Sequence, residues 1–382
     1  MLPCQRDLFS LPPGLHFLNA ARMTPLLRTV EAAGVAGVRR KTVPTEITAE
    51  TFFDDVEAVR ERFGRLVEAP AADVALAASA SYGMAAVANN VALGAGQTVV
   101  VVGDQFPSNV YPWRRLAADA GATVRTVAAP DAARRGQAWN AALLDAIGPE
   151  TALVSVPHVH WSDGTRFDLA AVGDRARAVG AVFVVDGTQS VGALPFSVAA
   201  LRPDALVCSA YKWLMGPYGA ALAVYGERFA DGVPVEETWI SRRGARDFSA
   251  LSDYTDAYAP GAVRYDVGGR SNPVTVPMLR AGLDQLLDWT PAAVQAYASA
   301  LSDRLCRRAG DLGWTSESAG ARCGHLVGLR PPAGTDLAAV HAGLAARGVR
   351  VSVRGDALRV SPHLYNDDAD VDALLDGLAA LA

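Results

Sequence analysis

The sequence predicts an α/β protein in which a mostly parallel, seven-stranded sheet is flanked by helices and followed by a small C-terminal α+β domain. Two observations support this fold class. Short apolar runs without polar alternation recur as far as Tyr225, as expected for strands that are buried on both faces. Amphipathic helical patterns lie between these runs, and such alternation is typical of parallel sheets covered by helices.

The elements of the first part follow in order. A helix is expected from Phe52 to Val67, where apolar residues recur at steps of three and four. A second helical run is expected over residues 84–93. Strands are expected at residues 74–78, 98–102, 123–127, 152–156, 181–185, 205–208 and 220–225.

Beyond about residue 255 the pattern changes to long helices. Thr290 is placed to cap a helix that has Pro291 in its first position. Strands at 325–329, 349–353 and 357–361, followed by a last helix, complete the small domain. We therefore predict an N-terminal segment (1–20) that lines the active site, a large cofactor-binding domain (21–260), and an interdomain helix with the small domain (261–382).

Composition excludes several classes of function. The 382 residues include 51% hydrophobic and 20% charged residues and carry a net charge of -5, so the basic excess required for nucleic-acid binding is missing. No apolar stretch reaches membrane-spanning length. The four cysteines have neither metal-ligand spacing nor the density of a disulfide framework, which predicts no metal and a cytoplasmic location.

Two residues at successive strand ends point to specific chemistry. Asp186 closes the apolar run 181–185, and Lys212 follows the next run in Ser209-Ala210-Tyr211-Lys212. This pair suits pyridoxal 5'-phosphate (PLP), because the lysine can hold the aldehyde as a Schiff base while the carboxylate keeps the pyridine nitrogen protonated. A helix-capping aspartate and a solvated lysine are the alternatives.

The motif Asp186-Gly187-Thr188-Gln189, together with the lysine segment, resembles the class V aminotransferase family, the cysteine desulfurase-like branch of fold-type I PLP enzymes. The likeness runs from Phe17 to Asn366. It implies that Gln189 bonds the cofactor's phenolic oxygen and that Phe106 stacks on its ring, where desulfurases have a histidine. The remaining cofactor contacts that we expect come from Ser209, Ala80, Ser81 and Tyr211.

The resemblance also implies substrate contacts. Arg359 is expected to bind the substrate α-carboxylate, with Trp161 and Asn19 nearby. Arg270 and Ser271 match a loop that reaches the partner's phosphate, which implies a homodimer with shared active sites. A core phenylalanine at position 106 and a solvated strand arginine at position 359 remain the alternatives.

Desulfurases that form a protein persulfide carry a cysteine shortly before the carboxylate-binding arginine, and residues 349–356 contain none. The leading hypothesis is therefore a PLP-dependent carbon–sulfur β-lyase that acts at Cα and Cβ of an S-substituted cysteine through an external aldimine. An aminotransferase, a decarboxylative deaminase or an epimerase is the alternative, and a non-catalytic PLP-binding protein is less favoured. The sequence does not define the substrate side chain.

Overall fold

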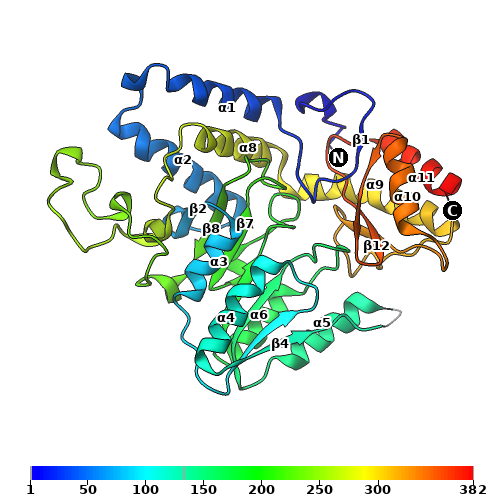
Figure 1. The fold of residues 1–382 in the computed structure, drawn as a ribbon, viewed down its shortest axis with the longest axis horizontal. Helices are drawn as coiled ribbons and strands as arrows, with labels where there is room; N and C mark the ends of the chain where they lie inside the picture. The colour runs from blue at the N-terminus through cyan, green and yellow to red at the C-terminus, as the bar shows by residue number, and fades with distance from the viewer. Residues whose placement is uncertain (1, 132–133, 382) are drawn as a thin grey trace.

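The computed structural model describes residues 2–131 and 134–381, and its centre is a seven-stranded sheet (Figure 1). The strand order is β2-β8-β7-β6-β5-β3-β4, and the last five strands of that order run parallel. β8 is antiparallel to both neighbours, so β2 runs in the same direction as β7. The strands are β2 (Val74–Ala77), β3 (Thr98–Val102), β4 (Thr123–Val127), β5 (Thr151–Pro157), β6 (Val182–Asp186), β7 (Ala205–Ser209) and β8 (Ala221–Tyr225).

Both faces of the sheet are covered by helices, which explains why its strands are apolar at consecutive positions. Alternate residues of one strand enter different cores: Val100 and Val102 belong to one core, and Val99 and Val101 to the other. The first core includes side chains of α2 (Ala49–Val67), α5 (Arg135–Ala146), α6 (Leu169–Ala178) and α8 (Thr275–Trp289). The second is closed by α3 (Ala80–Ala88) and α4 (Tyr111–Ala120).

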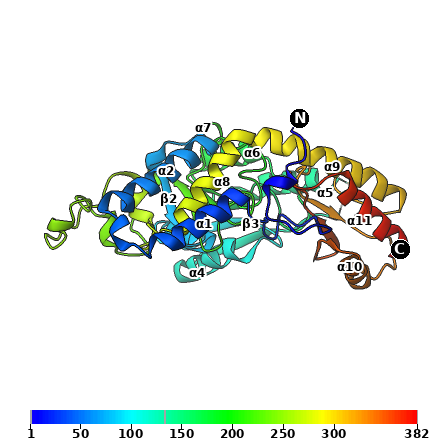
Figure 2. The same ribbon diagram turned by 90° about the horizontal axis from the view of Figure 1, so that it is seen from above.

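A smaller sheet lies at one end of the molecule, beside the C-terminal helices (Figure 2). Its order is β11-β12-β9 and its pairings are antiparallel. The elements of this part are β9 (Val327–Leu329), β11 (Ser352–Arg354), β12 (Ala357–Val360), α9 (Pro291–Asp311), α10 (Leu337–Ala346) and α11 (Asp368–Leu381). These elements share a separate apolar core, so the predicted α/β fold with a small α+β part is confirmed.

The N-terminal segment joins the small part. β1 (His16–Phe17) pairs in parallel with β10 (Val349–Arg350), and Asn19 forms an isolated bridge with Ser361. Leu18 is fully buried in the core of the small part. The first residues of the chain are therefore tied to its last strands, while the predicted domain limits stay a prediction.

Most predicted elements differ from the structure by no more than three residues at an end, and two differ more. The helix expected over 84–93 is α3, which begins at Ala80 because Ser79 caps it: the Ser79 hydroxyl accepts a hydrogen bond from the Tyr82 amide at 3.1 Å. The strand expected over 349–353 is divided at Val351, because β10 pairs with β1 whereas β11 pairs with β12. Thr290 caps α9 and Pro291 is its first residue, as predicted.

The helices α1 (Arg28–Arg40) and α2 pack on α8, on the far side of the large sheet from α3. Between β8 and α8 the described chain forms only short 3-10 turns, and Figure 1 shows this segment extending away from the sheet. None of the helices in the described part of the chain is both long and apolar enough to cross a bilayer.

Candidate active site

The predicted site residues gather at the carboxyl ends of the parallel strands. Asp186 is the last residue of β6, and Lys212 lies three residues beyond β7. Phe106 and Trp161 follow β3 and β5, which are the neighbouring strands at which the chain reverses its order across the sheet. Ligands of open α/β sheets bind at such a switch point. These side chains border a pocket that is lined by Ala80, Gln105, Phe106, Pro157, Val159, Trp161, Asp186, Thr188, Gln189, Ser209, Tyr211 and Lys212.

Lys212 is the buried amine of this pocket, with 6% of its surface exposed. Its Nζ lies 5.5 Å from the ring centre of Phe106 and 5.4 Å from that of Tyr211. Burial lowers the pKa of Lys212 from 10.5 to about 8; Asp186 opposes this shift, and Arg359 adds to it. A lysine with this pKa has a substantial neutral fraction near pH 8, as a nucleophilic or basic amine requires.

Asp186 supplies the acidic group. Its Oδ1 accepts a hydrogen bond from the Thr188 amide at 2.9 Å. Burial raises the pKa of the Asp186 carboxyl, whereas the hydrogen bonds of Thr188 and the charge of Lys212 lower it. A cationic partner in the pocket would therefore stabilise the ionised carboxylate further.

Gln189 and Ser209 are fixed by the same network. The Gln189 amide nitrogen donates to the Ala21 carbonyl at 3.0 Å, and its oxygen accepts from the Trp213 indole at 2.9 Å. One amide hydrogen of Gln189 remains available to a ligand oxygen. The Ser209 amide donates to the Thr188 hydroxyl at 3.1 Å, so Thr188 joins the ends of β6 and β7.

The amino end of α3 lies at the same edge of the sheet, because β2 and β7 run in the same direction. Ser79 caps the Tyr82 amide, whereas the amides of Ala80 and Ser81 precede the first intrahelical bond. Such free amides and the helix dipole attract a phosphate. Ala80 lines the pocket, whereas the Ser81 hydroxyl donates to Ser108 at 2.8 Å and does not line it.

Aromatic side chains form one wall of the pocket. Phe106 is 40% exposed and meets Trp161 edge to face, with ring centres 5.6 Å apart. Behind them Gln105 donates to the carbonyls of Asn109 and Ser155, and its buried oxygen has no partner among the described residues. The described pocket-lining residues include no histidine.

Arg359 lies next to this wall on β12 and is 1% exposed. It donates to the Trp161 carbonyl at 2.9 Å and to the Asn19 side-chain oxygen at 3.5 Å. Burial and two neighbouring arginines, Arg354 and Arg22, lower the pKa of Arg359 to about 9. Asn19 does not line the pocket; it is buried, and its side-chain oxygen accepts the hydrogen bond from Arg359.

Arg270 and Ser271 lie away from the pocket within the chain. Arg270 is buried and pairs with Asp266, which also accepts a hydrogen bond from Arg60. The Ser271 hydroxyl donates to the Phe52 carbonyl. Their predicted contact with a partner's phosphate stays a prediction.

Sequence reasoning missed three residues of the site: Thr188, Gln105 and Arg354. Thr188 lies within the Asp186-Gly187-Thr188-Gln189 motif, so the motif could have predicted it as a site residue. Arg354 could have been found from strand alternation, since it lies two residues after Ser352, which pairs with Arg359. Gln105 carried no comparable signal.

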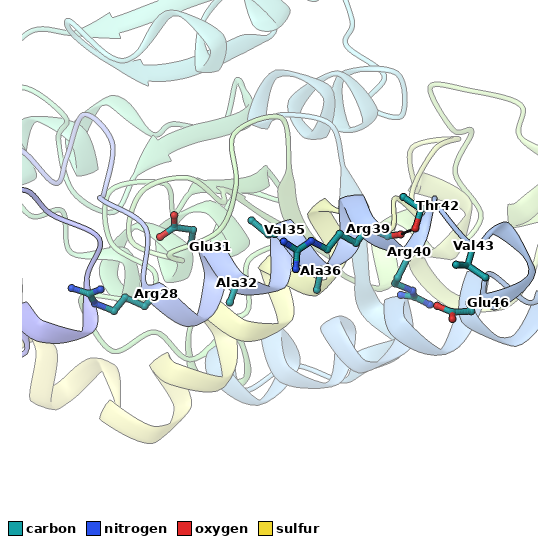
Figure 3. Close-up of a pocket in the computed structure, with 10 residues that line it drawn as sticks. All are labelled: Arg28, Glu31, Ala32, Val35, Ala36, Arg39, Arg40, Thr42, Val43 and Glu46. Atoms are coloured by element: carbon teal, nitrogen blue, oxygen red, sulfur yellow. Dashed lines mark hydrogen bonds between the residues drawn. The ribbon is translucent and has the colours of Figure 1, made fainter.

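A second hollow lies on the outer face of α1 and on the turn that follows it (Figure 3). It is lined by Arg28, Glu31, Ala32, Val35, Ala36, Arg39, Arg40, Thr42, Val43 and Glu46. It contains no residue of the sites predicted from the sequence. It is an open surface feature, whereas Lys212 lies in the narrower pocket at the strand ends.

A buried lysine, a carboxylate on the neighbouring strand and free helix amides at one sheet edge define a PLP-binding enzyme of fold type I. The sequence model of the family "Aminotransferase class-V" matches residues 38–312. The chain therefore belongs to the class V aminotransferase family, and its cofactor is PLP.

Individual relatives agree with this assignment. The isopenicillin N epimerase of Streptomyces clavuligerus is 27% identical over 332 residues, which cover 84% of this chain and 83% of the epimerase. The cysteine desulfurase CsdA of Escherichia coli has a similar fold, with a TM-score of 0.83 at 21% identity and coverage of 100% of this chain and 98% of that structure.

A third protein, C-DES, is also similar in fold. Its complex with cysteine persulfide, in which it is described as a cystine C-S lyase, has a TM-score of 0.87 at 20% identity and covers 97% of this chain and 98% of its own. A lysine-to-alanine variant of C-DES, with glycine covalently linked to PLP, has a TM-score of 0.89 at 19% identity. The match covers 99% of this chain and 100% of that structure.

The pocket fits this cofactor on its own chemistry. Lys212 offers the amine for the aldehyde, Asp186 a carboxylate for the ring nitrogen, and α3 free amides for the phosphate. The unpartnered Gln105 oxygen shows that the pocket wall retains hydrogen-bonding capacity for a polar occupant.

Proposed function

We propose that this enzyme catalyses β-elimination from an S-substituted cysteine, releasing a thiol, pyruvate and ammonium. The observation that carries the proposal is Lys212: it is the pocket-lining amine, its pKa is about 8, and no histidine of the described chain lines the pocket. β-Elimination requires one base at Cα, and Lys212 can serve as that base.

The cofactor would be held by the residues at the strand ends. We assign the aldehyde to Lys212, the ring nitrogen to Asp186, the phenolic oxygen to Gln189 and the phosphate to Ser209 with the amides of Ala80 and Ser81. Phe106 would cover the ring and Tyr211 would border it. Bound PLP supplies an electron-withdrawing ring that accepts the electron pair released at Cα.

The protein's own groups would then act on the substrate. Arg359 binds the α-carboxylate, since a guanidinium matches a carboxylate with two parallel hydrogen bonds. The Lys212 amine takes the Cα proton. The Cβ–S bond breaks with its electron pair on sulfur, which leaves as a thiol after protonation, and the remaining 2-aminoacrylate takes up water to give pyruvate and ammonium.

Two of the four cysteines are buried, and neither the exposed Cys4 nor the partly exposed Cys306 lines the pocket, which supports elimination over a protein persulfide. Burial raises the pKa of Cys323 to about 12, and burial also raises that of Cys208 well above its usual value. A persulfide requires an accessible thiolate. Cys323 instead lies in the core with its sulfur 3.5 Å from the Leu326 carbonyl.

The test is product analysis with the PLP-loaded enzyme. S-carboxymethylcysteine should give pyruvate, ammonium and mercaptoacetate in equal amounts, and cystine should give pyruvate, ammonium and cysteine persulfide. Lys212→Met should lower either rate at least about a hundredfold. The matched control is Lys41→Met, because Lys41 is exposed and is the only other lysine of the sequence. Failure of every cysteine conjugate to yield pyruvate would refute the proposal.

Epimerisation is the second candidate, because the isopenicillin N epimerase matches most of the chain at 27% identity. Chiral chromatography would then find both enantiomers of an intact substrate. A 2-oxo acid that keeps its side chain would instead identify the enzyme as an aminotransferase.

We also propose a homodimer that functions in a reducing compartment. Three exposed valines along α1 and the following turn, Val35, Val38 and Val43, support an interface there, as does the almost fully exposed Tyr254. The four cysteines form no disulfide. Light scattering should give twice the mass of the 382-residue chain, and a monomer would contradict this proposal.

A further inference from the structure

Three arginines converge on the substrate side of the pocket, and the α-carboxylate needs only one of them. We propose that the natural substrate carries a second anionic group on its side chain, which Arg354 and Arg22 bind beside Arg359. This inference rests on the proposed function in one respect, namely that Arg359 takes the α-carboxylate.

Strand geometry places Arg354 and Arg359 on one face of the small sheet. In the antiparallel pair β11–β12, Arg359 is directly opposite Ser352, and Arg354 is directly opposite Ala357. Residues two apart on a strand, and residues directly opposite across a pair, share a face. Both guanidinium groups therefore leave the sheet on the same side.

That side faces the pocket wall. Arg359 donates to the Trp161 carbonyl at 2.9 Å, and the Arg354 guanidinium lies 5.5 Å from the centre of the Trp161 ring. Trp161 itself lines the pocket and contacts Phe106. The Arg354 side chain thus lies against Trp161, a residue of the pocket wall, and we place the substrate side chain beside it.

Arg22 is brought to the same place by the N-terminal segment. The Ala20 amide donates to the Ser361 carbonyl at 3.1 Å, and the Thr24 amide donates to the Tyr211 carbonyl at 3.2 Å. The Ala21 carbonyl accepts from Gln189. Arg22 therefore sits in a turn held between β12 and the lysine loop, with its side chain exposed.

These charges are not neutralised by the protein. None of the ion pairs within residues 2–131 and 134–381 includes Arg22, Arg354 or Arg359. The buried Nε atoms of Arg354 and Arg359 have no hydrogen-bond partner among these residues. Burial and the charge of Arg22 lower the pKa of Arg354, so the cations repel one another.

Converging cations of this kind are costly unless an anion binds between them. One carboxylate bound by Arg359 leaves the charges of Arg354 and Arg22 without a partner. The substrate class that offsets them is an amino acid with a side-chain carboxylate or sulfonate and no side-chain amine, such as an S-carboxyalkyl cysteine. A neutral side chain of the same size would leave both charges unmatched.

Binding of unreactive ligands tests this inference without catalysis. Calorimetry with glutarate, and with glutaramate as its monoamide isostere, should show that the wild type binds the diacid about tenfold more tightly or better, as expected for one charge-assisted contact. The measurement is made on both the cofactor-free and the PLP-loaded protein. High salt should reduce the preference.

Arg354→Met and Arg22→Met should each reduce the diacid preference to about threefold or less. Arg307→Met is the matched control, because Arg307 is an exposed arginine of α9, and it should retain the wild-type preference. Circular dichroism identifies any variant that fails to fold, and Arg22→Gln, on an exposed turn, then replaces it.

A wild-type preference below about twofold, or a preference that survives both arginine substitutions, overturns the inference. The result is separate from that of the proposed function. If no conjugate yields pyruvate but the diacid preference holds, the lyase fails and the anion site stands. If neutral and acidic cysteine conjugates react equally well, the lyase stands and the anion site fails.

Discussion

Replacing Lys212 with methionine should stabilise the cofactor-free protein at neutral pH. Burial lowers the pKa of Lys212 from 10.5 to about 8, so the charged amine is less favourable in the fold than in the unfolded chain. At 1.36 kcal/mol per pKa unit, this difference corresponds to about 3 kcal/mol. Methionine removes the charge and retains an unbranched chain of similar length.

The pH dependence follows from linkage. Between pH 8 and pH 10.5 the unfolded chain still binds the proton that the folded protein has lost, so wild-type stability rises with pH in this window. The advantage of Lys212→Met should therefore be about 3 kcal/mol at pH 7, about 2 kcal/mol at pH 9 and below about 1 kcal/mol at pH 10.

Urea unfolding of both cofactor-free proteins at these three pH values measures the difference directly. Titrating groups that do not interact with Lys212 are common to both proteins and cancel; Asp186, whose pKa the charge of Lys212 lowers, is the exception. Lys41→Met should show no such trend, since Lys41 is exposed. A Lys212→Met variant that is less stable than the wild type at pH 7, or an advantage that does not change with pH, would refute the burial argument.

Two further substitutions test other parts of the site. Phe106→Leu should weaken PLP binding about two- to tenfold, as measured by absorbance titration, because it removes the aromatic ring face. Phe248→Leu is the control, because Phe248 is a similarly exposed aromatic residue, and it should leave PLP binding unchanged. Equal PLP affinities of the wild type and Phe106→Leu would exclude stacking. Asn19→Ala should raise the KM for the amino acid substrate about threefold with little change in kcat, because the Asn19 side-chain oxygen accepts a hydrogen bond from Arg359 and orients it. Asn89→Ala is the control and should leave KM unchanged. A fall in kcat with no change in KM would contradict this role.

Much of the fold could be predicted because six of the seven strands of the large sheet are apolar and buried, whereas the edge strand β4 is mostly exposed. Strands buried on both faces need no alternation, and helical patterns lie between the runs, so the large sheet was found within a few residues. Asp186 and Lys212 could be paired because parallel strands place their carboxyl ends at one edge. The structure brings both into one pocket with Gln189 and Ser209.

Three features could not be predicted, because they depend on contacts between segments that are far apart in the sequence or on side-chain packing. The division at Val351 exists because β1, more than 300 residues earlier, takes β10 as its partner while β11 turns to β12. The turn that carries Arg22 lies beside the lysine loop only because the Ala20 and Thr24 amides donate to the carbonyls of Ser361 and Tyr211. Gln105 is identified by an unpartnered buried atom, which only side-chain packing reveals.

Two of the three arginines, Arg359 and Arg354, also affect the basicity of Lys212. After burial and the opposing effect of Asp186, the charges of Arg359 and Arg354 are what lower the pKa of Lys212 further. A substrate whose two anionic groups neutralise these arginines would remove their contribution, and the pKa of Lys212 would rise while that substrate is bound. A neutral amine of higher pKa is the stronger base, but at a given pH a smaller fraction of it is neutral. A dianionic substrate would thus both fill the cationic site and raise the pH at which Lys212 is free to accept the Cα proton, whereas a neutral side chain would leave the charge of Arg354, and the lower pKa of Lys212, in place.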